Sequence, residues 1–254
     1  MSKSDEYRAR LRSLEAWDAY LLEQSGLPGP RCNIELAHVV ADEGQLPLFQ
    51  RYSAITRDQA PVNSPLEFLT FCGVIGLGQS LAEGQSLAEG QAGLLESLRI
   101  HASDPRWRVR EAVAMALQRL GDVNMEQLIL AMQAWCTGSM LEQRAAAAAL
   151  CEPRLLGQAA HVRAVLQILD TITASLERVE DRRGDALIAL RKGLGYCWSV
   201  AVVALPDEGK VLFEKWLAST NPNVQWVMRE NLKKARMSRM DDAWVKRWQG
   251  RDAG

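Results

Sequence analysis

One segment of this chain occurs twice, and that internal repeat restricts the fold more than any other feature of the sequence. Residues 103–117 read as an Asp-Pro turn followed by a helix with an apolar seam, and residues 219–232 repeat the pattern after Asn-Pro. A weaker third copy covers residues 138–150. Helical units that recur at roughly 35 to 45 residues are typical of an α-solenoid, because one hairpin cannot bury its apolar stripe without neighbours.

Apolar periodicity and helix-breaking residues divide the whole chain into pairs of helices. No segment shows the two-residue alternation of a half-buried strand. We therefore predict an all-α fold, a right-handed α-solenoid of about six helical hairpins that forms one domain over residues 1–254. A tandem hexapeptide at 78–89 predicts a longer loop or added helical turns. The expected pairs are 5–24 with 33–42, 45–56 with 64–83, 91–102 with 105–120, 124–136 with 140–150, 159–178 with 182–204, and 207–219 with 222–236, followed by a terminal helix at 241–249.

Three local patterns predict how particular helices begin and pack. Ser64, Pro65 and Glu67 indicate a helix start in which the serine accepts from a backbone amide and the glutamate reaches back to the cap. The glycines of 73–78 lack the strand and the Gly-Lys-Ser/Thr of a phosphate loop, so they indicate close helix packing. Residues 195–203 are apolar on nearly all sides, which predicts a helix covered by its neighbours.

The pattern Asp-Pro-x-x-x-Val-Arg-x-Ala from Asp104 to Ala112 resembles HEAT and HEAT-like repeats. In that family the Asp-Pro turn opens the second helix of a hairpin, and the arginine supports the turn or a neighbouring repeat. Arg110 and Arg144 match this arginine, whereas Gln225 occupies its place in the last copy. The resemblance implies HEAT-like hairpins whose second helices line a concave face, and such faces commonly bind protein partners.

The resemblance differs along the chain. It is clear over 91–237, whereas only helix pairing supports divergent N-terminal hairpins over 1–90. Residues 238–254 are expected to form a C-terminal cap, in which Trp244 and Trp248 close the last repeat.

Charge is unevenly distributed along the sequence. The formal net charge is −1, but residues 1–100 hold 8 Lys/Arg against 13 Asp/Glu, while residues 220–251 hold 8 against 3. The overall balance argues against a general attraction to nucleic acid. A basic C-terminal end can still bind an anionic partner, although a solvated helix face gives the same count.

The cysteines and the N-terminus indicate a reducing compartment. The five cysteines are odd in number and form no C-x-x-C pair, and the N-terminal segment is polar throughout. The longest apolar run, about 196–205, is too short to span a membrane. We therefore expect a cytoplasmic protein without a membrane partner.

Aromatic and basic residues gather on one side of the predicted helix at 222–236. Trp226, Arg229, Lys233 and Arg236 are spaced i, i+3, i+7 and i+10, away from the apolar seam. Such a stripe can hold a phosphate backbone and stack on a base, but long side chains that cover neighbouring helices give the same pattern. If the second helices line one groove, further binding candidates border it: Arg106, Trp107, Arg108, Arg110, Arg119, Arg182, Arg183, Arg191 and Lys192.

Two Trp-x-x-x-Glu pairs raise an enzymatic alternative, Trp107 with Glu111 and Trp226 with Glu230. They are similar to the Trp-x-x-x-Asp element of the HEAT-like bacterial alkylpurine DNA glycosylases. In that family the tryptophan borders the lesion and the aspartate assists loss of the alkylated base, which makes Glu111 and Glu230 the catalytic candidates. Here the acid is glutamate, and the fuller Trp-rich motif of that family is missing.

Taken with the fold, these features predict a non-enzymatic binding or scaffold protein that uses its concave face for a macromolecular partner. A protein partner is expected, with nucleic acid as a second option through the basic groove. No Cys/His spacing indicates a metal site, and no cofactor is expected. The alternatives are a DNA-binding repair protein or alkylbase DNA glycosylase, and a chaperone similar to the HEAT-like phycobilin lyases, which the repeats alone support.

Overall fold

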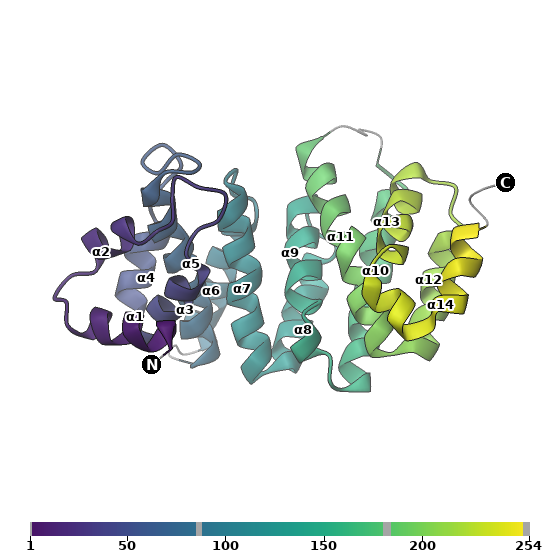
Figure 1. Ribbon diagram of the computed structural model, residues 1–254, viewed down its shortest axis with the longest axis horizontal. Helices are drawn as coiled ribbons and strands as arrows, with labels where there is room; N and C mark the ends of the chain where they lie inside the picture. The colour runs from purple at the N-terminus through teal and green to yellow at the C-terminus, as the bar shows by residue number, and fades with distance from the viewer. Residues whose placement is uncertain (1, 85–87, 180–183, 251–254) are drawn as a thin grey trace. The chain divides into compact units, whose positions relative to one another are not determined.

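The structure, a computed structural model, describes residues 2–84, 88–179 and 184–250 (Figure 1). Within these residues all regular structure is helical, which confirms the predicted all-α class. The chain divides into two compact units, 1–123 and 124–254, and each is described by itself. The single continuous solenoid stays a prediction.

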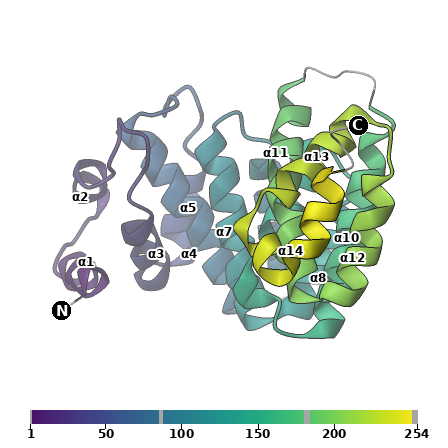
Figure 2. The same ribbon diagram turned by 45° about the vertical axis from the view of Figure 1, so that its right-hand side comes forward.

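The first unit is built around one central helix. Helix α5 contacts α2, α3, α4, α6 and α7, and most of its residues are buried. Figure 2 shows α5 beside α3, α4 and α7. A helix without a polar face must be covered on all sides, so the apolar core of this unit surrounds α5. The helices are α1 (Lys3–Arg12), α2 (Asp18–Glu23), α3 (Ile34–Glu43), α4 (Leu46–Ser53), α5 (Pro65–Ala82), α6 (Ala88–Ala102) and α7 (Trp107–Val123).

Glycines let α5 approach the helices on either side of it. A Cβ atom at Gly76 would overlap the ring of Phe49 in α4, and one at Gly78 would overlap the backbone of Ala116 in α7. These contacts confirm the predicted close packing of helices at the glycine-rich segment. The glycines serve the core, and no phosphate loop is formed.

The second unit also packs around one central helix. Helix α11 contacts α9, α10, α12, α13 and α14, and its Trp198 is fully buried and donates from Nε1 to Oγ1 of Thr173 at 3.0 Å. This burial confirms the prediction for 195–203. The elements are α8 (Met125–Trp135), α9 (Met140–Leu150), a short 3-10 helix (Pro153–Leu155), α10 (Ala159–Leu176), α11 (Asp185–Ala204), α12 (Pro206–Leu217), α13 (Pro222–Leu232) and α14 (Ala235–Gly250).

Two helices, α5 and α11, are long and apolar enough to cross a membrane by length and composition. However, 78% of the apolar window of α5 and 56% of that of α11 are buried inside the protein. The core helix of a globular unit meets the same criteria.

The single helix predicted over 5–24 is wrong, because the chain leaves the helical path between α1 and α2. The hydroxyl of Ser13 donates to the carbonyl of Arg10 at 2.7 Å, and Nε1 of Trp17 donates to the carbonyl of Leu11 at 3.0 Å. These side chains take the carbonyls that the next helical turn would use.

The predicted boundary at 236 is also wrong, because α13 ends at Leu232 and α14 begins shortly after. Helix α14 bends at Asp241, which has φ −160° and ψ 91°. The Asp241 carboxylate accepts from the backbone nitrogen of Trp244 at 3.0 Å and from Nζ of Lys210 at 2.6 Å. Asp241 thus acts as the N-cap residue of the second half of α14.

The start of α5 differs from the predicted capping box. Pro65 is the first helical residue, as expected, but the Ser64 side chain makes no capping hydrogen bond. The fully buried Glu67 accepts from the backbone nitrogen of Asn63 at 2.7 Å and from Nη1 of Arg108 at 3.2 Å. The glutamate joins α5 to α7, a contact between distant residues that local spacing could not reveal.

We expect two glycine substitutions to change stability in opposite directions. Gly78→Ala should lower the free energy of unfolding by about 1–3 kcal/mol, because the methyl group meets the backbone of α7. Gly93→Ala in α6 should raise it by about 0.4–1 kcal/mol, because a Cβ there meets nothing within 4 Å. Urea denaturation followed by circular dichroism measures both, and equal stability of Gly78→Ala and wild type would contradict the packing argument.

Candidate partner-binding face

Arg106 is an internal group of the first unit, with 2% of its surface exposed. Its Nε and Nη2 atoms donate to the Asp104 carboxylate at 3.0 and 2.7 Å. Nη2 also donates to the carbonyl of Ile55 at 3.2 Å, and Nη1 donates to Oγ1 of Thr70 at 3.3 Å and to the carbonyl of Ala60 at 3.4 Å. Contrary to the sequence-based expectation, Arg106 does not belong to an exposed binding surface, because its donors join the α6–α7 turn to the α4–α5 loop.

Arg108 is buried as well, with 4% exposed. Besides its ion pair with Glu67, it donates from Nη2 to the carbonyl of Gly29 at 2.6 Å. Its guanidinium carbon lies 4.5 Å from the ring centroid of Trp107, which is 46% exposed. The sequence analysis proposed Arg106, Trp107 and Arg108 as binding residues. Of these three, only Trp107 has a large exposed side chain.

In the second unit, Arg191 of α11 stacks on Trp226 of α13. The guanidinium carbon lies 4.5 Å from the ring centroid, and Nη1 donates to Oδ1 of Asn223 at 2.9 Å. The tryptophan ring lies over Gly195, where a Cβ would come within 3.2 Å of Cζ3. Because Gly195 has no side chain, the Trp226 ring can pack against α11 at this point. The ring in turn positions the Arg191 guanidinium.

A second stack joins α14 to α11. The guanidinium carbon of Arg236 is 4.6 Å from the ring centroid of Tyr196, and Nη2 donates to the tyrosine hydroxyl at 2.6 Å. Tyr196 is 43% exposed. The sequence analysis did not select Tyr196, although it follows Lys192 by one turn of α11 and so shares its face.

Two arginine–aromatic stacks and the basic residues on the same helices make up a set of residues that we call the α11–α13 face. The predicted stripe does not lie on one helix, because Lys233 follows the end of α13 and Arg236 belongs to α14. Lys233 donates to Glu230 at 2.6 Å, and Lys192, Arg229 and Lys233 are exposed. The members of the face are Arg191, Lys192, Tyr196, Trp226, Arg229, Lys233 and Arg236.

The groove expected to join the candidates of both halves stays a prediction. Trp107 belongs to the first unit and the α11–α13 face to the second. Arg119 binds within the first unit, where it donates to Asp42 at 2.8 Å. Arg182 and Arg183 lie outside the described residues.

The enzymatic alternative also stays a prediction. Glu111 lies on α7 and Glu230 on α13, where it accepts from Lys233. Burial raises the pKa of the Cys32 thiol to about 11 and holds that of Cys72 well above its usual value, so neither supplies a thiolate nucleophile near neutral pH. In the described part of the chain, no group of three or more His, Cys, Asp or Glu could hold a metal ion.

We expect Arg106→Met to destabilise the protein by about 3–5 kcal/mol, because it leaves the largely buried Asp104 carboxylate without its paired cation and removes the guanidinium donor to the carbonyl of Ala60. Arg163→Met is the matched control, since Arg163 forms an exposed ion pair with Glu208 and should contribute far less. Chemical denaturation of both variants measures the difference. Equal losses would contradict the internal role of Arg106.

Two tryptophans on the same pair of helices should differ in their contribution to stability. Trp198→Ala should cost about 3–5 kcal/mol, because the side chain is fully buried. Trp226→Ala should cost clearly less, because its ring is only partly covered by Arg191 and α11. Thermal unfolding of the two variants checks this order, and the reverse order would mean that Trp226 belongs to the core.

The turn before α7 has the geometry that the resemblance to HEAT repeats implies. Nη1 of Arg110 donates to the carbonyls of Asp104 and Pro105 at 2.6 and 3.1 Å, so the arginine supports the turn that opens its helix.

In comparisons with known proteins, no protein family, curated protein or solved structure matches this chain.

Proposed function

We propose that this chain is a HEAT-like α-solenoid binding protein that holds an acidic segment of a protein partner on the α11–α13 face. The observation that carries the proposal is the pair of arginine–aromatic stacks, Arg191 on Trp226 and Arg236 on Tyr196. The exposed side chain of Lys192 adds positive charge to the same face.

The stacks prepare each guanidinium for binding. Immobilising a long side chain costs about 0.5–1.5 kcal/mol on association, and a side chain already held in place avoids part of this cost. Arg191 is held by Trp226 and Asn223, and Arg236 is held by the ring and hydroxyl of Tyr196. The planar guanidinium fork matches a carboxylate in two parallel hydrogen bonds, so a glutamate or aspartate side chain fits this arrangement.

The stacks also favour a protein partner over nucleic acid. Proteins that bind single strands stack successive bases on open aromatic faces. Here Arg191 covers one face of Trp226, and Arg236 covers one face of Tyr196. A carboxylate accepts hydrogen bonds from the N–H groups at the edges of the guanidinium groups. It can therefore bind while both guanidinium groups remain stacked on their rings.

The solenoid part of the proposal is supported by the order of the helices. Helices α10 with α11 and α12 with α13 are successive hairpins in contact, and α11 contacts α13. Most of the face thus lies on the second helices of neighbouring hairpins, and Arg236 of α14 adds to it. Such second helices line the binding surface in HEAT-like solenoids.

A labelled glutamate-rich peptide tests the proposal by fluorescence anisotropy. Arg191→Gln and Arg236→Gln should each weaken binding by about tenfold, which corresponds to about 1.4 kcal/mol for a charge-assisted contact. Arg163→Gln is the matched control, because it removes the same charge from α10, where Arg163 pairs with Glu208. Binding should also weaken as salt is added, because the charges lie at the surface.

Three outcomes would contradict the proposal. The first is no peptide binding by the wild type, and the second is an equal loss in Arg163→Gln. The third is a single-stranded oligonucleotide that binds more tightly than the peptide, which would assign the face to nucleic acid. Release of an alkylated base that depends on Glu111 or Glu230 would instead support the glycosylase alternative.

A further inference from the structure

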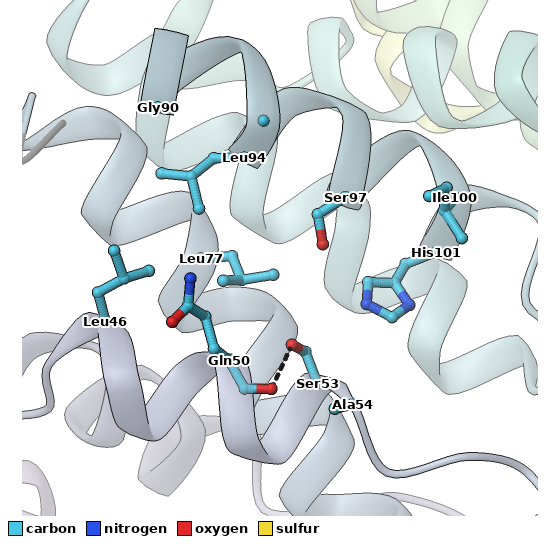
Figure 3. A pocket seen from close by; sticks show the side chains of 11 residues that line it. Leu46, Gln50, Ser53, Ala54, Leu77, Gly90, Leu94, Ser97, Ile100 and His101 are labelled. Atoms are coloured by element: carbon cyan, nitrogen blue, oxygen red, sulfur yellow. Dashed lines mark hydrogen bonds between the residues drawn. The ribbon is translucent and has the colours of Figure 1, made fainter. Parts of the chain in front are cut away.

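A groove of about 670 Å³ lies in the first unit, between α4 and α6 and above α5 (Figure 3). Leu46 of α4, Leu77 of α5 and Leu94 of α6 bring apolar side chains to it from three helices. Ligand pockets in proteins commonly have volumes of about 300–1,000 Å³ and a mainly apolar lining with a few polar groups. The groove has both properties, and the α11–α13 face plays no part in it.

Among the described residues that line the groove, the polar groups are few and carry no formal charge. Gln50 and Ser97 reach it from opposite helices, and His101 lies at one end (Figure 3). The hydroxyl of Ser53 donates to the carbonyl of Gln50 at 3.2 Å, so it is already used within α4. Burial lowers the pKa of His101, so its imidazole is neutral at pH 7. A ligand with a formal charge would find no counter-charge here and would lose its hydration.

One glycine of the groove has no packing role in the protein itself. A Cβ at Gly93 of α6 would meet nothing within 4 Å, whereas Cβ atoms at Gly76 and Gly78 of α5 would overlap neighbouring helices. Glycine inside a helix costs about 1 kcal/mol relative to alanine. At the same groove, Ile100 is 65% exposed, so a large apolar side chain is left in water. Open space at Gly93 and an exposed Ile100 are both expected where a ligand covers the surface.

We propose that this groove binds a small uncharged molecule that has an extended apolar part and one neutral hydrogen-bonding end group. The apolar part lies along the leucines of α4, α5 and α6, and the end group bonds to the amide of Gln50 or the imidazole of His101. A medium-chain alcohol represents this chemical class. The site is separate from the proposed protein-binding face and does not depend on it.

The neutral dye N-phenyl-1-naphthylamine, whose fluorescence rises in apolar surroundings, tests the site in the full-length protein. We expect saturable binding at one site, and displacement by 1-decanol at concentrations about tenfold or more below those needed for decanoate, because the carboxylate stays unpaired. Gly93→Leu fills the groove and should weaken dye binding by about tenfold or more. Gly157→Leu is the matched control, since a Cβ at Gly157 also meets nothing within 4 Å and Gly157 lies in the second unit.

Ser97→Leu repeats the test one helical turn further along α6, and circular dichroism checks that each variant keeps its helix content. No saturable dye binding by the wild type would overturn the proposal. So would unchanged binding in both groove variants, or equal displacement by decanol and decanoate.

Discussion

Both units depend on covering a long apolar helical surface, which is most of α5 in the first unit and the second half of α11 in the second. Burial of apolar surface is the dominant favourable term in folding, and residues 197–202 of α11 are buried, whereas its first half carries the exposed Lys192. Around α5, Gly76 and Gly78 remove bulk so that α4 and α7 can approach. Around α11, Trp198 fills space between helices. Most of the remaining helices contact one of these two, whereas α1 packs on α3 and α8 packs on α9 and α10. The proposed sites lie where the covering is incomplete.

Arginine has two different roles in this protein, and burial decides between them. Arg106 and Arg108 lie inside the first unit, where they pair with the carboxylates of Asp104 and Glu67 and donate to backbone carbonyls. Arg191 and Arg236 stack on aromatic rings of the second unit and hold their charge near the surface. The first pair joins helices and loops within the unit, whereas the second pair is only partly buried and belongs to the proposed binding face.

The two proposed sites differ in the chemistry that they accept. The α11–α13 face is basic and aromatic, so it suits a carboxylate-bearing peptide and should weaken with salt. The groove at Gly93 is neutral and apolar, so it suits an uncharged molecule and should respond little to salt. Because the sites lie in different units, variants in one leave the residues of the other unchanged.

The sequence by itself determined the helical class, most helix positions and the turn that Arg110 supports, because periodicity, proline and capping residues act over a few neighbouring positions. It also placed Trp226 away from the apolar seam of its helix. Only the tertiary structure decided that Arg106 is buried and that Tyr196 stacks on Arg236, because these contacts join residues more than 35 positions apart. The groove of the first unit could not be predicted from the sequence either. It is formed by residues of α4, α5 and α6, which become neighbours only in the folded protein. Local spacing specifies which side of a helix is apolar. Whether a polar side chain is buried, and what it contacts, depends on which distant helix packs over it.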